Sequence, residues 1–437
     1  MKLNLHQSML WLLLSLSLPM QASCLKANVA SISITPPLSM KYTLGGYGER
    51  NNQPATAIHD PIFAKALALK QGNRKYVIVT LDLLGLPSNV KTDLIQRISK
   101  NGWKAENIML LPSHSHGSLE MAALNDKNSL NIPQLGIYQK ELLDFLLDRL
   151  ETLILEADRN YRTVRIGTKT KIVEGMNRNR RKDPDVDRDL IVTRVDLING
   201  TPMAVLVNWT AHPTFLGAKD MQLSAEWPGY LQNALQTYIG KGVTAMYYNG
   251  AEGDQSTILN EPAADDYRKI EIYGKKIATI AFDLYHEIIP EKVGNFAWKY
   301  QIIQLPYHQS HPTFMKTGGE EYGLTESSVK IVMNILCPER VGVGVLRIGD
   351  LIIAGVPGEM TAILGKKIKN ALASGQVKQV AIGGLANEWI SYILEKNQYL
   401  NGEGYESSMS FYGPDLGAVL SEGIIRNGLP LTIYRHQ

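Results

Sequence analysis

Apolar residues recur along the chain in two alternating patterns. Short runs rich in Val and Ile predict buried strands, and longer stretches with apolar residues at every third or fourth position predict amphipathic helices. Predicted strands cover 75–85, 107–113, 189–197, 203–209, 242–249, 296–305, 343–357 (a hairpin turning at Gly349 and Asp350) and 379–384. Predicted helices cover 89–102, 134–157, 227–240, 263–289 and 360–374. This alternation predicts an α/β fold whose mixed sheet is flanked by helices on both faces.

The first 23 residues carry the pattern of an export signal, in which Lys2 precedes an apolar core over 9–20 and small residues then form a cleavage site. A transmembrane helix needs about 20 apolar residues. This core is shorter, and no later apolar stretch reaches that length. We therefore expect export, to a periplasm or to the outside of the cell. Cys24 stands where a lipoprotein signal places its lipidated cysteine, although Gln21 replaces the usual aliphatic residue. A lipid anchor at Cys24 is left open.

Composition limits the classes of partner. The chain has 437 residues, of which 44% are hydrophobic and 20% charged, so it can bury a large core. Its net charge is +3 and its one basic run is "NRNRRK" at 177–182, which does not make a nucleic-acid-binding stripe. Two cysteines exclude a disulfide framework. We expect a small-molecule partner and no nucleic acid.

Residue types that bind metals or attack carbonyls follow the ends of five predicted strands. They are His114, His116, His212, Ser256, Glu359 and Tyr392. Each has an ordinary structural explanation by itself, such as a solvated loop histidine, a helix cap or a packing tyrosine. Their shared position is more informative, because ligand sites in open α/β sheets form beyond the carboxyl ends of the strands. We therefore place a candidate site at that edge.

The chemistry of this set favours zinc. Two or three neutral imidazoles and a carboxylate form a typical Zn²⁺ ligand set with room for water, and zinc lowers the pKa of bound water to about 7. In "NGAEGDQS", Gly250 and Gly253 let backbone N–H groups approach a substrate oxygen, and the alcohol of Ser256 can bond to a carbonyl or attack it. A hydrolytic centre is the prediction.

Six short boxes occur in a fixed order along nearly the whole chain after the signal. They are "SHSHGS" at 113–118, "NRN" at 177–179, "TAHPT" at 210–214, "NGAEGDQST" at 249–257, "PGEMT" at 357–361 and "NEWISY" at 387–392. In this order they resemble the boxes of the neutral ceramidases, exported zinc amidases that cleave the N-acyl bond of ceramide. Six ordered boxes are a far more specific signal than any one of them.

The resemblance implies a role for each box. It implies one Zn²⁺ per chain, held by His114, His212, Glu359 and Tyr392. It implies catalytic roles for His116 in proton transfer, Arg178 on the substrate carbonyl or head group, and Ser256. Further implied substrate-binding residues are Asn179, Gly253 and Asp254. The nucleophile, either Ser256 or zinc-bound water, is left open, as is a second, structural cation.

Three departures from the family pattern concern the substrate. Asn179 replaces a serine, "STI" at 256–258 replaces Ser-Pro-Asn, and "HGSL" at 116–119 replaces His-Ser-Gly-Pro. All three departures change residues that we expect to line the pocket, and none of them changes a proposed zinc ligand. We expect retained chemistry on a substrate that need not be ceramide.

The resemblance also bears on domain organisation. The chain ends 45 residues after Tyr392 (437 minus 392), so we expect residues 24–437 to form a single catalytic domain without the C-terminal β-sandwich of the ceramidases.

The predicted function is zinc-dependent hydrolysis of an N-acyl amide, in ceramide or a related lipid-like or small N-acylated compound. Two alternatives stay open. One is a zinc-dependent esterase or deacetylase acting on another acylated substrate. The other is a non-catalytic exported binding protein of the same fold. The oligomeric state cannot be derived from the sequence.

Overall fold

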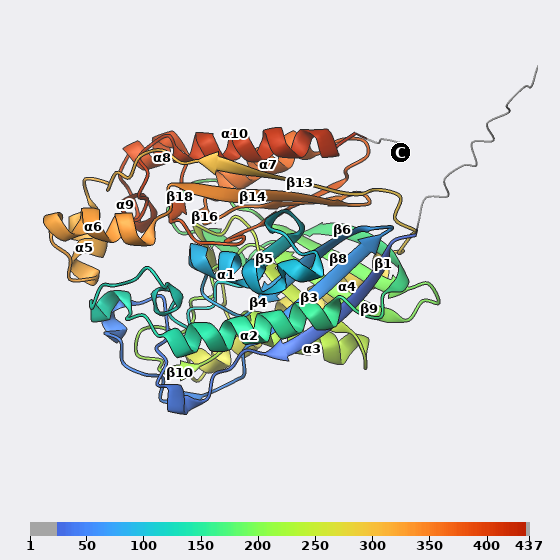
Figure 1. Cartoon of the computed structure of the whole chain (residues 1–437), viewed down its shortest axis with the longest axis horizontal. Helices are drawn as coiled ribbons and strands as arrows, with labels where there is room; N and C mark the ends of the chain where they lie inside the picture. The colour runs from blue at the N-terminus through green and yellow to red at the C-terminus, as the bar shows by residue number, and fades with distance from the viewer. Residues whose placement is uncertain (1–23, 434–437) are drawn as a thin grey trace, which may run out of the picture.

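Two β-sheets form the centre of the protein (Figure 1). The computed structural model describes residues 24–433, and the predicted export signal lies outside them. The larger sheet has the order β11-β9-β8-β6-β1-β3-β4-β5 and the smaller one β13-β14-β15-β17. The strands of the larger sheet are β1 Lys26–Ser33, β3 Phe63–Gln71, β4 Arg74–Leu81, β5 Ile108–Pro112, β6 Arg162–Ile172, β8 Asp189–Leu197, β9 Pro202–Trp209 and β11 Thr244–Asn249. Those of the smaller sheet are β13 Phe296–Gln304, β14 Arg340–Ile348, β15 Leu351–Gly355 and β17 Gln379–Gly383.

Both sheets mix parallel and antiparallel pairs. In the larger sheet, β4 and β5 run parallel, as do β9 and β11, while the strands between them pair antiparallel. In the smaller sheet, β14 and β15 form the predicted hairpin, with Gly349 at a positive φ of 64°, and β15 runs parallel to β17. The prediction of a mixed α/β fold is confirmed.

The helices lie outside the two sheets. Helices α1 (Ser88–Ile98), α2 (Lys140–Ala157), α3 (Glu226–Ile239) and α4 (Asp266–Glu287) pack on the larger sheet. Helices α7 (Ala362–Leu372) and α10 (Leu416–Gly428) pack on the smaller sheet. The shorter helices are α5 (Gly318–Glu321), α6 (Glu326–Leu336), α8 (Lys396–Leu400) and α9 (Tyr405–Ser408). Within residues 24–433, no helix is both long enough and apolar enough to cross a membrane.

The arrangement of the layers differs from a single sheet with helices on both faces. The two sheets stack on each other, so each has helices on its outer face and the other sheet on its inner face (Figure 1). Strand β4 shows the pattern, because Val77 and Val79 pack toward α1 and α2 while Ile78 packs with Ile353 of the smaller sheet. A strand that is buried on both faces has the same run of apolar residues whether helices or a second sheet cover it. Periodicity therefore could not separate the two arrangements.

A buried polar residue ties the sheets together near their centre. The Asn208 amide, on β9, donates to the carbonyl of Tyr248 at 3.1 Å and to that of Ile382, on β17, at 3.0 Å. A buried amide left without partners costs about 1–3 kcal/mol. This pair of bonds therefore favours one relative placement of the two sheets.

A second polar contact joins helix α7 to the strands of the larger sheet. The Lys369 ammonium lies 2.7 Å and 2.8 Å from the two carboxylate oxygens of Asp187 and 3.0 Å from Asp189. Asp187, only 2% exposed, also accepts a hydrogen bond from Thr210, two residues before His212. This ion pair therefore supports the loop that carries a candidate ligand.

Replacing Lys369 with Met should destabilise the fold, because Asp187 would be left as an uncompensated buried charge. Removing one partner of a buried pair costs about 3–5 kcal/mol. Urea unfolding should show this loss for Lys369→Met. The matched control is Lys367→Met on the exposed face of the same helix, which should change stability by about 0.5 kcal/mol or less. Equal stabilities of the two variants would contradict the role given to Lys369.

Candidate metal centre

The carboxyl ends of strands from both sheets meet at one edge, and the four predicted zinc ligands lie there. His114 comes two residues after β5 ends, and His212 three residues after β9 ends. Glu359 and Tyr392 lie directly opposite each other on two short parallel strands, β16 (Glu359–Met360) and β18 (Tyr392–Ile393), which follow β15 and β17. All four side chains are between 1% and 6% exposed. Each sheet thus contributes two of the four residues.

The amide of Asn249 fixes the spacing of the two histidine loops. From the end of β11, it donates to the carbonyl of Ser113 at 3.2 Å and to that of Ala211 at 3.0 Å. These carbonyls directly precede His114 and His212. Because one amide holds both loops, the separation of the imidazoles is set by the strands beneath them.

Backbone carbonyls orient both imidazoles. The Nδ1–H of His114 donates to the carbonyl of Leu84 at 2.7 Å, and that of His212 donates to the carbonyls of Glu252 at 2.8 Å and Gln255 at 3.1 Å. With Nδ1 carrying the proton, Nε2 is the free nitrogen of each neutral ring. A hydrogen bond from the other ring nitrogen to a backbone carbonyl is typical of metal-binding histidines.

Both free nitrogens face the same carboxylate oxygen. Oε2 of Glu359 lies 3.0 Å from Nε2 of His212 and 3.3 Å from Nε2 of His114. Three lone-pair-bearing atoms so close together repel one another unless a cation lies among them. The other carboxylate oxygen, Oε1, accepts a hydrogen bond from the Trp389 indole at 2.8 Å, so the carboxylate is held in this orientation. The donor set therefore fits a metal ion.

The charge states of these groups agree with that fit. Burial, then the charge of Arg180, lowers the pKa of His212 to about 4, so its imidazole is neutral at physiological pH. Burial by itself raises the pKa of Glu359, but the neighbouring His114 and His212 hold that pKa well below its usual range. A neutral imidazole for His212 and an ionised carboxylate for Glu359 are the forms in which these side chains bind metals.

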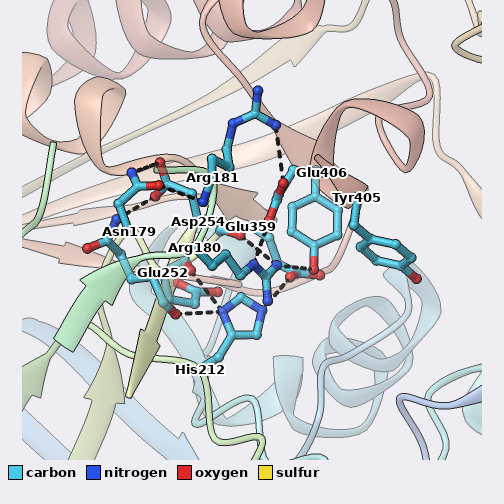
Figure 2. Close-up of polar contacts among 12 residues, drawn as sticks. Asn179, Arg180, Arg181, His212, Glu252, Asp254, Glu359, Tyr405 and Glu406 are labelled. Carbon is cyan, nitrogen blue, oxygen red and sulfur yellow. Dashed lines mark hydrogen bonds and ion pairs between the residues drawn. The ribbon is translucent and has the colours of Figure 1, made fainter. Parts of the chain in front are cut away.

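Arg180 lies next to His212 and Glu359 (Figure 2). The guanidinium of Arg180 donates to the Tyr392 hydroxyl at 3.0 Å and to the carbonyl of Gly253 at 2.8 Å. Its Nε lies 2.5 Å from the carboxylate of Glu406, a residue only 2% exposed. Burial raises the pKa of the Tyr392 phenol well above its usual value. Arg180 therefore holds the phenol in place beside Glu359.

His116 lies on the cavity side of His114. The two Nε2 atoms are 3.3 Å apart, and the nitrogens of His114, His116 and His212 can form a single metal-binding group. Burial, then the nearby His114 and His212, lowers the pKa of His116 well below its usual value. A neutral imidazole thus stands beside the cluster of His114, His212 and Glu359.

Arg178, an expected catalytic residue, is exposed and does not line the cavity. Strand β7 (Asn177–Asn179) pairs with β12 (Gln255–Thr257), and side chains alternate along it, so Asn177 and Asn179 are buried while Arg178 is exposed. After the strand ends, the chain turns and directs Arg180 into the cavity. The arginine that reaches the site is therefore Arg180.

Ser256 is not placed in the cavity either. It lies on β12, in register with Arg178, and forms a backbone bridge with His212. Ser256 therefore does not line the cavity, and its expected catalytic role stays a prediction.

The three expected substrate-binding residues lie behind the ligands. Asn179 donates to the carboxylate of Asp254 at 2.8 Å, and Asp254 also accepts the backbone N–H of Ala362 at 2.9 Å. A Cβ on Gly253 would come within 2.5 Å of the carbonyl oxygen of Glu359. None of the three lines the cavity. The structure thus places them where they support the backbone around Glu359.

Several site residues were not singled out from the sequence. Arg180 was read only as part of a basic run, and Trp389 lay unremarked inside the "NEWISY" box. Asn249 only opens the "NGAEGDQST" box, and Glu406 gave no signal beyond its polar type, because its partner Arg180 is 226 residues away.

Glu252 is fully buried, and neither of its carboxylate oxygens has a hydrogen-bond partner within residues 24–433. Burial raises the pKa of its carboxyl well above the usual value.

A cavity of about 500 Å³ opens on the candidate metal centre. Its lining changes character from one part to the other. Around the centre it is polar, with His114, His116, His212, Glu359, Tyr392, Arg180, Tyr47, Glu120, Glu321 and Tyr405. Away from the centre it is apolar, with Leu324, Val329, Val332, Met333, Leu336, Phe314, Met409 and Phe411. Such a cavity fits a molecule with one polar and one apolar part.

Comparison with known proteins agrees with this architecture. Residues 28–242 and 324–420 match the family described as neutral/alkaline non-lysosomal ceramidase, N-terminal. Neutral ceramidase B of Dictyostelium discoideum is 19% identical over an alignment covering 85% of this chain and 67% of that protein. Neutral ceramidase of Drosophila pseudoobscura pseudoobscura is 31% identical over 28% of this chain and 17% of its own length. The matched regions thus span about two thirds of the first relative and less than a fifth of the second.

The fold is also similar to a solved structure. The crystal structure of neutral ceramidase from Pseudomonas aeruginosa superposes with a TM-score of 0.79 at 19% identity, covering 94% of this chain and 75% of that one. The fold and the site together define an α/β protein with a buried histidine and carboxylate centre at the edge of two stacked sheets. The chain belongs to the neutral/alkaline non-lysosomal ceramidase family.

Replacing His212 with Ala should abolish stoichiometric metal binding, because it removes one of the nitrogens that face Glu359. The measurement is metal content by mass spectrometry after dialysis against trace zinc. His311→Ala is the matched control, since His311 begins the same tetrapeptide "HPTF" but binds Thr313 and the carbonyl of Tyr399 instead. Retention of one metal equivalent by His212→Ala would contradict the assignment.

Proposed function

We propose that the protein is a zinc-dependent hydrolase that cleaves the N-acyl amide bond of ceramide or a related N-acylated compound. The observation that carries the proposal is the meeting of His114, His212 and Glu359 around one point at the end of a cavity with a polar and an apolar part. The family membership and the names of the relatives support an amide substrate.

Zinc is the metal that we propose for this site. The residues that would hold it are His114, His212, Glu359 and Tyr392, a set of nitrogen and oxygen donors that suits Zn²⁺ in a catalytic centre. When bound, zinc acts as a Lewis acid toward a carbonyl and lowers the pKa of coordinated water to about 7. A phenol ligand must lose its proton, and the cationic Arg180 3.0 Å away favours that loss.

Arg180 is proposed to stabilise the negative charge that develops on the substrate carbonyl oxygen. It lines the cavity with Glu359, and Glu406 and the carbonyl of Gly253 hold its guanidinium in place before substrate arrives. Donors fixed in advance cost no reorganisation during the reaction, which is why such groups contribute strongly to rate.

His116 is proposed to move a proton to the leaving nitrogen. Its Nε2 faces the ligand cluster, and its neutral form can accept a proton there and return it to the departing amine. Transfer of this kind contributes about 10² to 10⁴ in rate. Because Ser256 does not line the cavity, the geometry favours water over the Ser256 hydroxyl as the attacking group.

The domain and localisation assignments are part of the same proposal. Residues 24–437 would form one catalytic domain, delivered to the periplasm or the outside by the signal in residues 1–23. Cys24, the first described residue, is exposed, as a lipid anchor would require.

A panel of substrates tests the proposal. N-acyl amides that include ceramide should be hydrolysed by the purified protein, a chelator should abolish the activity, and added Zn²⁺ should restore it. Mass spectrometry of the released acid and amine gives the rates. Zinc-dependent turnover of an ester with no detectable turnover of any amide would replace the amidase assignment with an esterase. No turnover despite one bound metal would favour a binding protein.

Arg180→Lys should lower kcat by about 10²-fold, the typical effect of removing one fixed oxyanion donor. Lysine keeps the positive charge but lacks the planar guanidinium, whose N–H groups contact Glu406, Gly253 and Tyr392 at the same time. The matched control is Arg178→Lys, two residues earlier and exposed, which should leave kcat and KM within about twofold of wild type. Metal content should stay at one equivalent in both variants. A larger loss in Arg178→Lys than in Arg180→Lys would reverse the assignment.

A further inference from the structure

The apolar part of the cavity begins at the candidate metal centre and leads away from it along aromatic rings. Trp389 donates to Glu359, its ring centroid lies 6.4 Å from that of Phe411, and the Phe411 centroid lies 5.6 Å from that of Phe314. Met409 packs beside Phe314, because a Cβ on Gly318 would meet the side chains of both. A chain of carbon atoms attached at the metal centre would therefore find a continuous apolar wall.

Helix α6 closes this apolar part on its outer side. Its residues Val329, Val332, Met333 and Leu336 line the cavity, while Ile331 on the opposite face is 55% exposed. Figure 1 shows α5 and α6 at the periphery of the molecule, beyond the ends of the sheets. The wall between the cavity and solvent is thus a single helix thick.

The cavity lining also contains a polar and acidic group of residues, with Glu120, Glu321 and Tyr405. The Tyr405 hydroxyl donates to the carboxylate of Glu321 at 3.1 Å, and this carboxylate accepts the backbone N–H of Gly48 at 3.3 Å. Glu120 also lines the cavity, with a carboxylate oxygen 2.9 Å from the backbone N–H of Ala122. Acceptors dominate here, so hydroxyl and ammonium donors are favoured and carboxylates are repelled.

We propose that the apolar part holds the acyl chain of the substrate and that α6, through Val332 and Met333, sets the length of acyl chain that is accepted. This inference rests on the proposed hydrolase function. The amine half of the substrate then lies toward Glu120 and Glu321.

The chemistry of the two products supports this orientation. Cleavage of an N-acyl amide by water gives a carboxylic acid and an amine, and the amine takes up a proton at neutral pH. The amine half becomes a donor-bearing cation, which suits the carboxylates of Glu120 and Glu321. The acyl half carries only methylene groups beyond its carbonyl, and each one buried gains about 0.8 kcal/mol in the apolar part.

The first test compares two substitutions on the same helix. Val332→Phe fills the cavity, and Ile331→Phe adds the same ring on the exposed face. On N-acyl amides with one amine and acyl chains of 2 to 18 carbons, Val332→Phe should lower kcat/KM at least tenfold for the long chains and less than twofold for the acetyl compound. Ile331→Phe should match wild type throughout. If Val332→Phe instead responds to the length of the amine half, the orientation is reversed and the proposal fails.

A second variant and a binding measurement cover the case in which the larger side chain disturbs folding. Met333→Ala enlarges the cavity and should shift the preferred acyl length upward. Calorimetry with free fatty acids should show wild-type affinity rising up to about fourfold per methylene and levelling off at the preferred length. Met333→Ala should move that plateau to longer chains, and an unmoved plateau would contradict the role of α6.

The binding measurement also separates the two proposals. Length-dependent fatty-acid binding without hydrolysis of any amide would overturn the hydrolase function and leave the acyl-chain site standing. Hydrolysis with kcat/KM independent of acyl length in wild type and in both cavity variants would overturn the acyl-chain site and leave the hydrolase function standing.

Discussion

The site depends on one arrangement, the carboxylate of Glu359 held between the Nε2 atoms of His114 and His212. These groups come from different sheets, so the arrangement exists only while the sheets remain stacked in a fixed position. Hydrophobic burial between the sheets supplies most of the stacking energy, but it is not directional. Direction comes from buried polar contacts such as those of Asn208 across the sheets and of Asn249 beneath the histidine loops.

The surroundings of this arrangement prepare it for a cation. Backbone carbonyls fix the protonated nitrogen of each imidazole, and the Trp389 indole fixes the second carboxylate oxygen. Arg180 takes no part in the cluster itself, since Glu406 and the Gly253 carbonyl engage it from behind. The centre therefore combines imidazole nitrogens with the carboxylate of Glu359, and the positive charge of Arg180 stands behind them, beside Tyr392.

The positions of the candidate ligands could be predicted because strand ends can be read from local patterns. His114, His212, Glu359 and Tyr392 each follow a recognisable strand, and parallel strands bring such residues to one edge. The exposed position of Arg178 could not be predicted, because a three-residue strand alternates sides too briefly to be detected. Nothing local distinguishes a strand covered by a second sheet from one covered by helices, so the stacking was missed. Helix α6 was not predicted, although α1 and α7, which are also 11 residues long, were.

His114 has a backbone feature with a separate consequence. Its φ is +69°, in the left-handed region that non-glycine residues adopt only at a cost on the order of 1–3 kcal/mol. The bonds of its backbone N–H to Leu83 and of its ring to Leu84 hold it there. A glycine would relax this conformation and remove the ligand. At this position, the residue that gives the more stable backbone cannot bind the metal. Selection of variants for heat resistance alone would therefore favour glycine over His114.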